Sequence, residues 1–250
     1  MADEKKMAVL IDADNVSADY IGVIFEELAN YPYTVTYKHI YGDWTSTRLA
    51  GWKKVLLDYS ITPIQQYSYT TGKNATDSAL IIDAMDIMYS GRVDAFCIVS
   101  SDSDFTRLAS RLRESGMFLI GMGEKKTPKP FISACEVFKY LEVIAKVPEP
   151  EPVVQTSTGK KKKTQKEKPL SEDSTKLINL IRKIVDEGSD EDGWMNLGRV
   201  ANTLQKRIPD YDIRNYGYSK LKQLVIASNR FKIESRPAGE YAPITYIANK

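Results

Sequence analysis

Short apolar runs alternate with longer amphipathic segments through the first 141 residues, and this alternation limits the folds that the chain can adopt. The apolar or β-branched runs, which have the length of buried strands, are residues 7–11, 34–41, 61–65, 95–100 and 117–122. The segments with apolar residues at helical spacing are 17–29, 47–59, 74–89 and 105–114, and residues 130–141 close the series. This alternation predicts an α/β domain, with a mostly parallel, Rossmann-like sheet between helix layers.

A second feature divides the chain. The stretch KVPEPEPVVQTSTGKKKKTQKEKP, residues 146–169, has no apolar periodicity and is rich in proline and lysine. Such a composition cannot bury enough surface to fold alone, so we expect a flexible linker between domains at 1–145 and 170–250. Its lysine run is either a solvated tether or a non-specific contact with phosphates.

Charge is distributed unevenly around this linker. Residues 1–147 carry a net charge of −3, residues 148–170 a net charge of +3, and residues 171–250 a net charge of +2. An acidic N-terminal part and a basic C-terminal part suggest that the two domains have different functions.

The composition also narrows the cellular setting and the metal chemistry. No run is long enough to cross a membrane, and no signal-peptide pattern precedes the first apolar run, so we expect a cytoplasmic protein. Cys97 and Cys135 lie in apolar surroundings and are expected to be buried free thiols. With one histidine and two separated cysteines, a zinc site is not expected.

Acidic side chains follow two of the predicted strands. The first run leads directly into Asp12, Asp14 and Asn15, and the run 95–100 is followed by Asp102 and Asp104. In sheets of this kind, sites form beyond the carboxyl ends of the strands. If both strands are central and parallel, the two acidic clusters lie at the same edge of the sheet.

A third acid comes from the predicted helix 74–89. At 100° per residue, Asp77 falls on the apolar face of this helix, whereas Asp83 and Asp86 fall off it and are expected to be solvated. The apolar residues of that face are Leu80, Ile81, Ala84, Met85 and Met88. Asp77 is therefore expected to join Asp12, Asp102 and Asp104.

Each polar residue also has a local alternative. Helix N-caps could be supplied by Asn15, Ser17, Ser101, Asp102 or Ser103. Asp77 could simply be a first-turn acid stabilised by the helix dipole. Capping does not require three separate segments to converge, however, and several carboxylates at one place would raise one another's pKa. A divalent cation relieves that repulsion, and ligation by oxygen alone favours Mg²⁺ or Mn²⁺, which typically serve phosphoryl chemistry.

Two families fit this pattern of acids. The stretch DADNV matches the D-x-D-x-[TV] box of haloacid-dehalogenase-like phosphatases, but Lys73, the lysine that family would need, comes in the wrong order of elements. The better match is the NYN domain of the PIN-like nuclease group, within its LabA-like branch. The resemblance covers residues 7–142 and rests on VLIDADN, GKNATDSALIIDAM, IVSSDSDFTRLASRLRESG and GEKKTPKPFISACEVFKYLE.

The resemblance implies metal-dependent cleavage of RNA. In it, Asp12, Asp77, Asp102 and Asp104 are the catalytic, metal-binding carboxylates, and Asn15 is the polar partner of the first aspartate. Ser101 and Ala13 stand where many members carry glycine. The mechanism implied is in-line attack of a metal-activated water on a phosphodiester, for which no histidine base is needed.

Other residues near this predicted edge have two readings each. Lys73, Lys125, Lys126 and Lys129 serve either solubility or the steering of RNA phosphates. Tyr41 and Trp44 either pack or stack on bases. His39 is read as a strand residue rather than a catalytic one.

The rear domain has three segments of helical periodicity followed by two strand-like runs, RFKIE and YAPITYI, which predict a winged helix-turn-helix. Ser219 is expected to cap the third helix. The stretch PDYDIRNYGYSKL resembles the LOTUS, or OST-HTH, domain, which implies binding of RNA or of a protein partner. The candidate phosphate contacts are Arg214, Lys220, Lys222 and Arg236.

Together these features predict a metal-dependent ribonuclease with a tethered RNA-binding winged-helix domain. The alternative is a non-catalytic RNA-binding adaptor whose acidic pocket is vestigial. The sequence leaves the RNA substrate, the choice of internal or terminal cleavage, the number of metals and the oligomeric state open.

Overall fold

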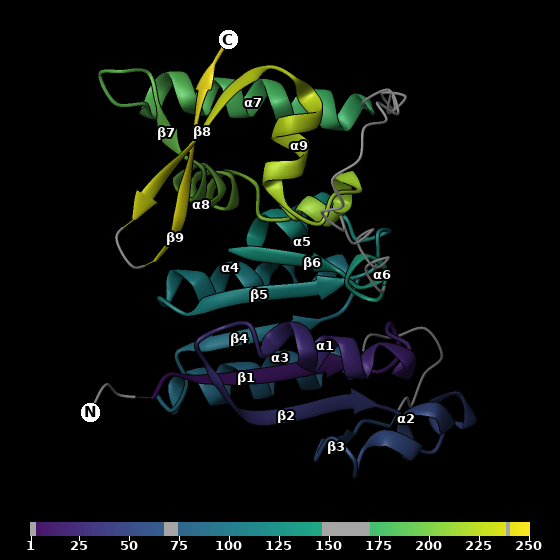
Figure 1. Cartoon of the computed structure of the whole chain (residues 1–250). Helices are drawn as coiled ribbons and strands as arrows, with labels where there is room; N and C mark the ends of the chain where they lie inside the picture. Colours follow the sequence, from purple (N-terminus) through teal and green to yellow (C-terminus); the bar gives the residue numbers. More distant parts are fainter. Residues whose placement is uncertain (1–3, 68–74, 147–170, 239–240) are drawn as a thin grey trace. The chain divides into compact units, whose positions relative to one another are not determined.

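A computed structural model describes residues 4–67, 75–146, 171–238 and 241–250 of the chain (Figure 1). Its contacts divide the chain into two compact units, Met1–Lys146 and Val147–Lys250. Each unit is considered by itself below.

The N-terminal unit is built on a six-stranded sheet in which every neighbouring pair of strands is parallel. The strands are β1 (Lys6–Asp12), β2 (Thr34–Gly42), β3 (Thr62–Gln65), β4 (Ala95–Val99), β5 (Phe118–Gly123) and β6 (Val137–Tyr140). Their order is β3-β2-β1-β4-β5-β6, so the direction of the strand order switches between β1 and β4. This confirms the predicted α/β class, and it puts the expected site position where β1 and β4 end.

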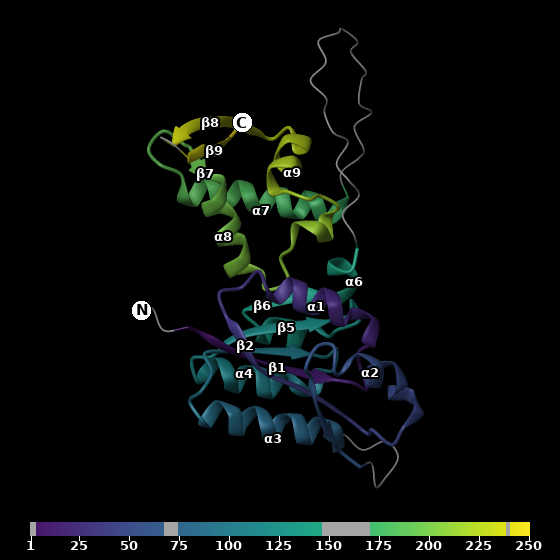
Figure 2. The same ribbon diagram turned by 60° about the horizontal axis from the view of Figure 1, so that its bottom comes forward.

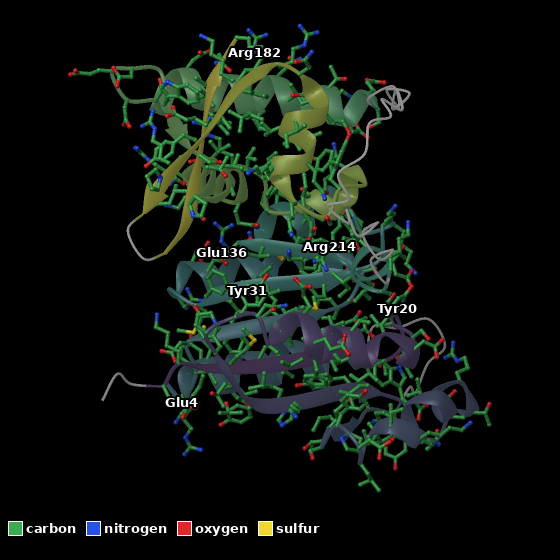
Figure 3. All side chains as sticks on the ribbon, in the orientation of Figure 1. Glu4, Tyr20, Tyr31, Glu136, Arg182 and Arg214 are labelled. Atoms are coloured by element: carbon green, nitrogen blue, oxygen red, sulfur yellow. The ribbon has the colours of Figure 1, made fainter. Side chains whose placement is uncertain are left out.

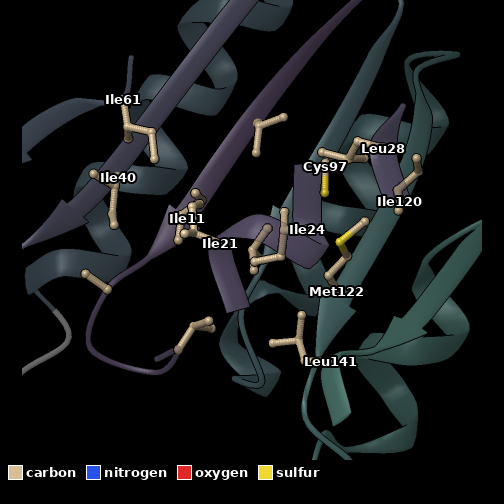
Figure 4. Packing of buried hydrophobic residues seen from close by; sticks show 14 of the residues in the cluster. Ile11, Ile21, Ile24, Leu28, Ile40, Ile61, Cys97, Ile120, Met122 and Leu141 are labelled. Carbon is tan, nitrogen blue, oxygen red and sulfur yellow. The ribbon is translucent and has the colours of Figure 1, made fainter. Parts of the chain in front are cut away.

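Helices cover both faces of this sheet (Figure 2). One face carries α1 (Ile21–Leu28), α2 (Ala50–Val55) and α6 (Leu141–Ile144); the other carries α3 (Ala75–Tyr89), α4 (Thr106–Glu114) and α5 (Lys129–Ala134). Alternation along β1 explains the two cores, because Val9 and Ile11 face one layer while Ala8 and Leu10 face the other. Figure 4 shows the first core, where Ile21 and Ile24 of α1 pack over Ile11.

The closing segment differs from the single element expected at 130–141. It consists of α5, β6 and α6, because the chain becomes extended at Cys135 and Glu136 is held against β5. The Glu136 carboxylate accepts the backbone N–H of Leu119 at 2.8 Å and pairs with Arg113 at 2.9 Å. These contacts lay the short run Val137–Tyr140 beside β5 as a sixth strand.

The C-terminal unit contains α7 (Glu172–Gly188), α8 (Leu197–Arg207), a 3₁₀ turn at Ile213–Tyr216, and α9 (Leu221–Ser228). Its antiparallel sheet has the order β7-β9-β8, formed by Met195–Asn196, Tyr241–Asn249 and Phe231–Ala238. The predicted small winged helix-turn-helix is thereby confirmed, with the two-residue β7 as an addition. Ser219 does not cap α9; the N-cap is Lys220, and the Gln223 side chain accepts the Ser219 N–H at 3.1 Å.

No helix within the described ranges combines the length and the apolar character that a membrane crossing needs.

Candidate functional site

The candidate site lies at the carboxyl edge of the N-terminal sheet. Figure 3 labels Glu4 near the amino end of β1 and Tyr20 near the opposite edge, toward which the strands run. Asp12 is the last residue of β1, and its neighbour Ile11 pairs with Val99, the last residue of β4. The residues that follow both strands therefore meet at one place, as the topology predicts.

Asp12 is fully buried, and its carboxylate accepts three hydrogen bonds. Its Oδ1 accepts the backbone N–H of Asp14 at 3.1 Å, and its Oδ2 accepts Nδ2 of Asn15 at 2.7 Å and Oγ of Ser100 at 2.8 Å. Burial raises the pKa of the Asp12 carboxyl, and the bonds from Asn15 and Ser100 oppose that rise.

Ser100 connects Asp12 to the acids that follow β4. Its hydroxyl oxygen, which donates to Asp12, also accepts the backbone N–H of Asp102 at 3.1 Å. Asp102 in turn accepts the backbone N–H of Asp104 at 2.9 Å and so caps the 3₁₀ turn Ser103–Phe105. The capping role and membership of the acidic group therefore coexist in Asp102.

Asp77 reaches the same place from the first turn of α3. It is largely buried beside Thr76, whose hydroxyl donates to Oδ2 of Asp14 at 3.0 Å and ties the start of α3 to the loop after β1. Burial, followed by the charges of Asp12, Asp102 and Asp104, raises the pKa of Asp77 to about 6.

The convergence of three acids gives the site its chemical character. One carboxylate oxygen each from Asp77, Asp102 and Asp104 lie within 4.8 Å of one another. Carboxylate oxygens alone form this donor set, which suits a hard cation such as Mg²⁺ or Mn²⁺. Burial is the main cause of the raised pKa of Asp77 and the neighbouring carboxylates add to it, and a divalent cation would offset their mutual repulsion. Asp12 lies outside this group of three, although its charge contributes to the shift.

At this edge, Asn15 makes a hydrogen bond with an acid and Ser101 makes one with the backbone. Asn15 serves Asp12, whereas Ser17 caps the turn that follows by accepting the N–H of Asp19 at 3.3 Å. Ser101 is buried, and its hydroxyl accepts the backbone N–H of Glu124 at 2.9 Å, so it joins the end of β4 to the end of β5. Space is tight there, because a Cβ on Gly123 would lie 2.6 Å from the carbonyl oxygen of Ser100.

The structure describes three of the four lysines that were expected near this edge of the sheet. Lys125 and Lys126 are exposed just after β5, where Lys126 pairs with Glu124 at 2.8 Å and the backbone N–H of Lys125 donates to Glu142 at 3.0 Å. Lys129 is exposed at the start of α5. Lys73 lies outside the described residues.

The aromatic side chains of β2 and its following loop are engaged within the protein. Tyr41 is fully buried, and the indole Nε1 of Trp44 donates to the carbonyl oxygen of Ile64 at 3.0 Å, so packing accounts for both. The expectation that Asp83 is solvated is wrong. Its carboxylate accepts hydrogen bonds from the Tyr41 hydroxyl and from Nδ1 of His39, the latter at 2.7 Å.

In the C-terminal unit, the four candidate phosphate contacts differ in their partners and in their exposure. Arg214 is held by Asp212 through two bonds, from Nε at 2.9 Å and from Nη2 at 2.7 Å. Arg236 lies over the ring of Tyr246 at 4.4 Å and pairs with Glu234 at 3.2 Å. The basic side chains exposed at the start of α9 are Lys220 and Lys222.

The chain matches two domain families when it is compared with known proteins. The profile of the NYN domain matches residues 6–142, and that of the OST-HTH/LOTUS domain matches residues 168–243. Among solved structures, a protein of unknown function from Vibrio parahaemolyticus is 20% identical, with a TM-score of 0.46. That alignment covers 55% of this chain and 94% of the Vibrio chain. Comparison with curated proteins gives no match.

Proposed function

The chain belongs to the NYN domain family, and from that membership we propose that its N-terminal unit is a metal-dependent ribonuclease that hydrolyses phosphodiester bonds in RNA. The observation that carries the proposal is the convergence of Asp77, Asp102 and Asp104 within 4.8 Å at the switch point of a parallel sheet. The same membership associates the unit with nucleases.

Asp77, Asp102 and Asp104 are the proposed ligands of Mg²⁺ or Mn²⁺. A bound divalent ion supplies positive charge for the phosphate oxygens and lowers the pKa of a water molecule. Asp12, with its three donors, is proposed to hold the loop after β1 and the start of the loop after β4 in register. Its buried charge also adds to the negative potential that favours a cation.

The reaction proposed is hydrolysis in one displacement. A water oxygen gives up a proton to solvent and bonds to phosphorus, the bond from phosphorus to the leaving ribose oxygen breaks, and the leaving oxygen takes up a proton from solvent. Asn15, Ser100 and Ser101 orient the acids and the backbone around them. Lys125 and Lys126, exposed at the same edge, are proposed to attract the RNA backbone.

The C-terminal unit is proposed to hold RNA near this site through Lys220 and Lys222. An OST-HTH/LOTUS domain follows the NYN domain, and we propose the limits 1–145 for the nuclease, 146–169 for the tether and 170–250 for the winged helix. A tether of this length gives an effective concentration in roughly the millimolar range, so even weak binding would increase occupancy of the site.

The test is cleavage of labelled single-stranded RNA by the full chain with Mg²⁺ or Mn²⁺. We expect cleavage that EDTA abolishes and that falls at least about 100-fold in the Asp12→Asn, Asp102→Asn double variant. Asp86→Asn, an exposed change on α3, is the matched control and should retain full activity. Cleavage that survives in the double variant would refute the site assignment. Binding of RNA without any cleavage would favour the adaptor function.

A further inference from the structure

Helix α3 carries a second acid that faces the protein. Asp83 follows Asp77 by six residues, and its side chain is 28% exposed. The carboxylate accepts hydrogen bonds from the hydroxyl of Tyr41 and from Nδ1 of His39, the only histidine of the chain. Both donors belong to β2, two residues apart on one face of that strand.

These bonds add a directional restraint to the apolar contacts of α3. The buried residues of the helix's inner face include Leu80, Ala84 and Met88, and apolar contacts are non-directional. Hydrogen bonds to an ionised carboxylate are directional and are among the stronger ones in proteins. Both bonds run from β2 to the same oxygen of Asp83, so they tie α3 to that strand at one point.

The strand that provides these bonds is also tied to the candidate metal site. Tyr41 pairs in register with Asp12 across β2 and β1. Leu10 shares the core face with Tyr41, so alternation along β1 directs the side chain of Asp12 to that face as well. The bonds of Asp83 therefore set α3 relative to the strand pair that carries Asp12.

Asp77 moves with α3 because six residues of helix span only about 9 Å. Its oxygen must lie close to those of Asp102 and Asp104 for all three to hold one ion. A displacement of about 1 Å in such a constellation can reduce function by roughly 100-fold.

We propose that Asp83 is a positioning residue, which with His39 and Tyr41 holds α3 so that Asp77 meets Asp102 and Asp104. Asp83 does not touch the reacting atoms. The inference rests on the proposed function in so far as Asp77 is taken as a metal ligand.

The experiment compares the full chain with its Asp83→Ala, Asp83→Asn and Tyr41→Phe variants. Asp86→Ala is the matched control, since it removes an exposed carboxylate three residues further along the same helix. Metal-free crystal structures give the separation of the Asp77 and Asp102 carboxylates. Calorimetry well below the melting temperature gives the Mn²⁺ dissociation constant.

For Asp83→Ala we expect the carboxylates to separate by about 1 Å or more and the Mn²⁺ dissociation constant to rise about tenfold. Both donors reach the same oxygen, Oδ2 of Asp83, and Asp83→Asn can keep an uncharged oxygen there, so it should recover part of both effects. Tyr41→Phe should give a smaller change in the same direction, and Asp86→Ala should match the wild type.

The inference is overturned if Asp83→Ala folds with Asp77 in place and with Mn²⁺ affinity within about twofold of the wild type, because Asp83 would then serve stability alone. If that variant does not fold, the position of Asp77 and the Mn²⁺ affinity of Tyr41→Phe serve as the test in its place. A wild-type chain that binds no Mn²⁺ would refute the proposed function, whereas the metal-free structures would still decide whether Asp83 positions Asp77.

Discussion

The hydroxyl of Ser100 and the carboxylate of Asp12 lie 2.8 Å apart at the ends of adjacent parallel strands, and both are fully buried. The same hydroxyl oxygen accepts the N–H of Asp102. Ser100 therefore joins the acid that ends β1 to the acid that follows β4, and it aligns the two loops from which the candidate site is built.

Replacing Ser100 with alanine should destabilise the protein and loosen the site together. Asp12 would lose one of three donors, and the N–H of Asp102 would lose its acceptor. We expect the free energy of unfolding, measured in urea, to fall by about 1–3 kcal/mol. Ser103→Ala, an exposed change three residues away, should alter it by less than about 0.5 kcal/mol. Equal effects of the two substitutions would show that the Ser100 bond does not organise this edge.

Asp77 should make the metal-free protein less stable as the pH rises. Its pKa is about 6 in the folded protein against an ordinary value of 3.8, so the folded state holds the proton more tightly than the unfolded state. The protonated Asp77 contributes its full stabilisation below about pH 3.8, and this contribution is lost as the pH rises to about 6. With EDTA at pH 7.5, Asp77→Asn should therefore raise the free energy of unfolding by about 1–2 kcal/mol.

The gain from Asp77→Asn should shrink toward pH 4, because Asp77 of the wild type is then protonated in the folded state and partly protonated in the unfolded state. Saturating Mn²⁺ should reverse the order at pH 7.5 by stabilising the wild type more than the variant. A variant that is no more stable than the wild type at pH 7.5 in EDTA would mean that the acids do not repel one another as described.

Lys220 and Lys222 should account for part of the salt dependence of RNA binding. Each phosphate contact contributes to the slope of the logarithm of the binding constant against the logarithm of salt concentration, at roughly −0.7 per contact for a single strand. The Lys220→Ala, Lys222→Ala double variant should flatten this slope by about 1 or more, measured by fluorescence anisotropy in EDTA. Arg214→Ala should flatten it less, because Asp212 already holds that guanidinium. An unchanged slope in the double variant would remove this face from RNA recognition.

Local periodicity was sufficient to predict most elements of the fold. The apolar run 7–11 lies within β1, and the segment predicted at 74–89 corresponds to α3, described as Ala75–Tyr89. The parallel arrangement then implied that residues after β1 and β4 share one edge, and the position of Asp77 on the apolar face of its helix added it to Asp102 and Asp104.

Features that depend on distant partners could not be predicted in this way. The bonds of Asp83 come from residues 44 and 42 positions earlier, and Asp83 lies just off the apolar face of α3, where helical periodicity alone predicts solvent. The alternation of Tyr37, His39 and Tyr41 on one face of β2 was the available signal, since polar aromatic groups under a helix need a partner. The strand β6 was missed for the same reason, because the contacts of Glu136 with Leu119 and Arg113 define it.

We propose that acids from α3 and from the loop after β4 hold one hard cation beside Asp12. Anomalous diffraction from crystals of the full chain soaked in Mn²⁺ would locate such an ion. We expect a single strong peak about 2.0–2.4 Å from carboxylate oxygens of Asp77, Asp102 and Asp104, and we expect Asp102→Asn to abolish it. If saturating Mn²⁺ gives no peak at this position, or binds only elsewhere, the proposed metal site is wrong.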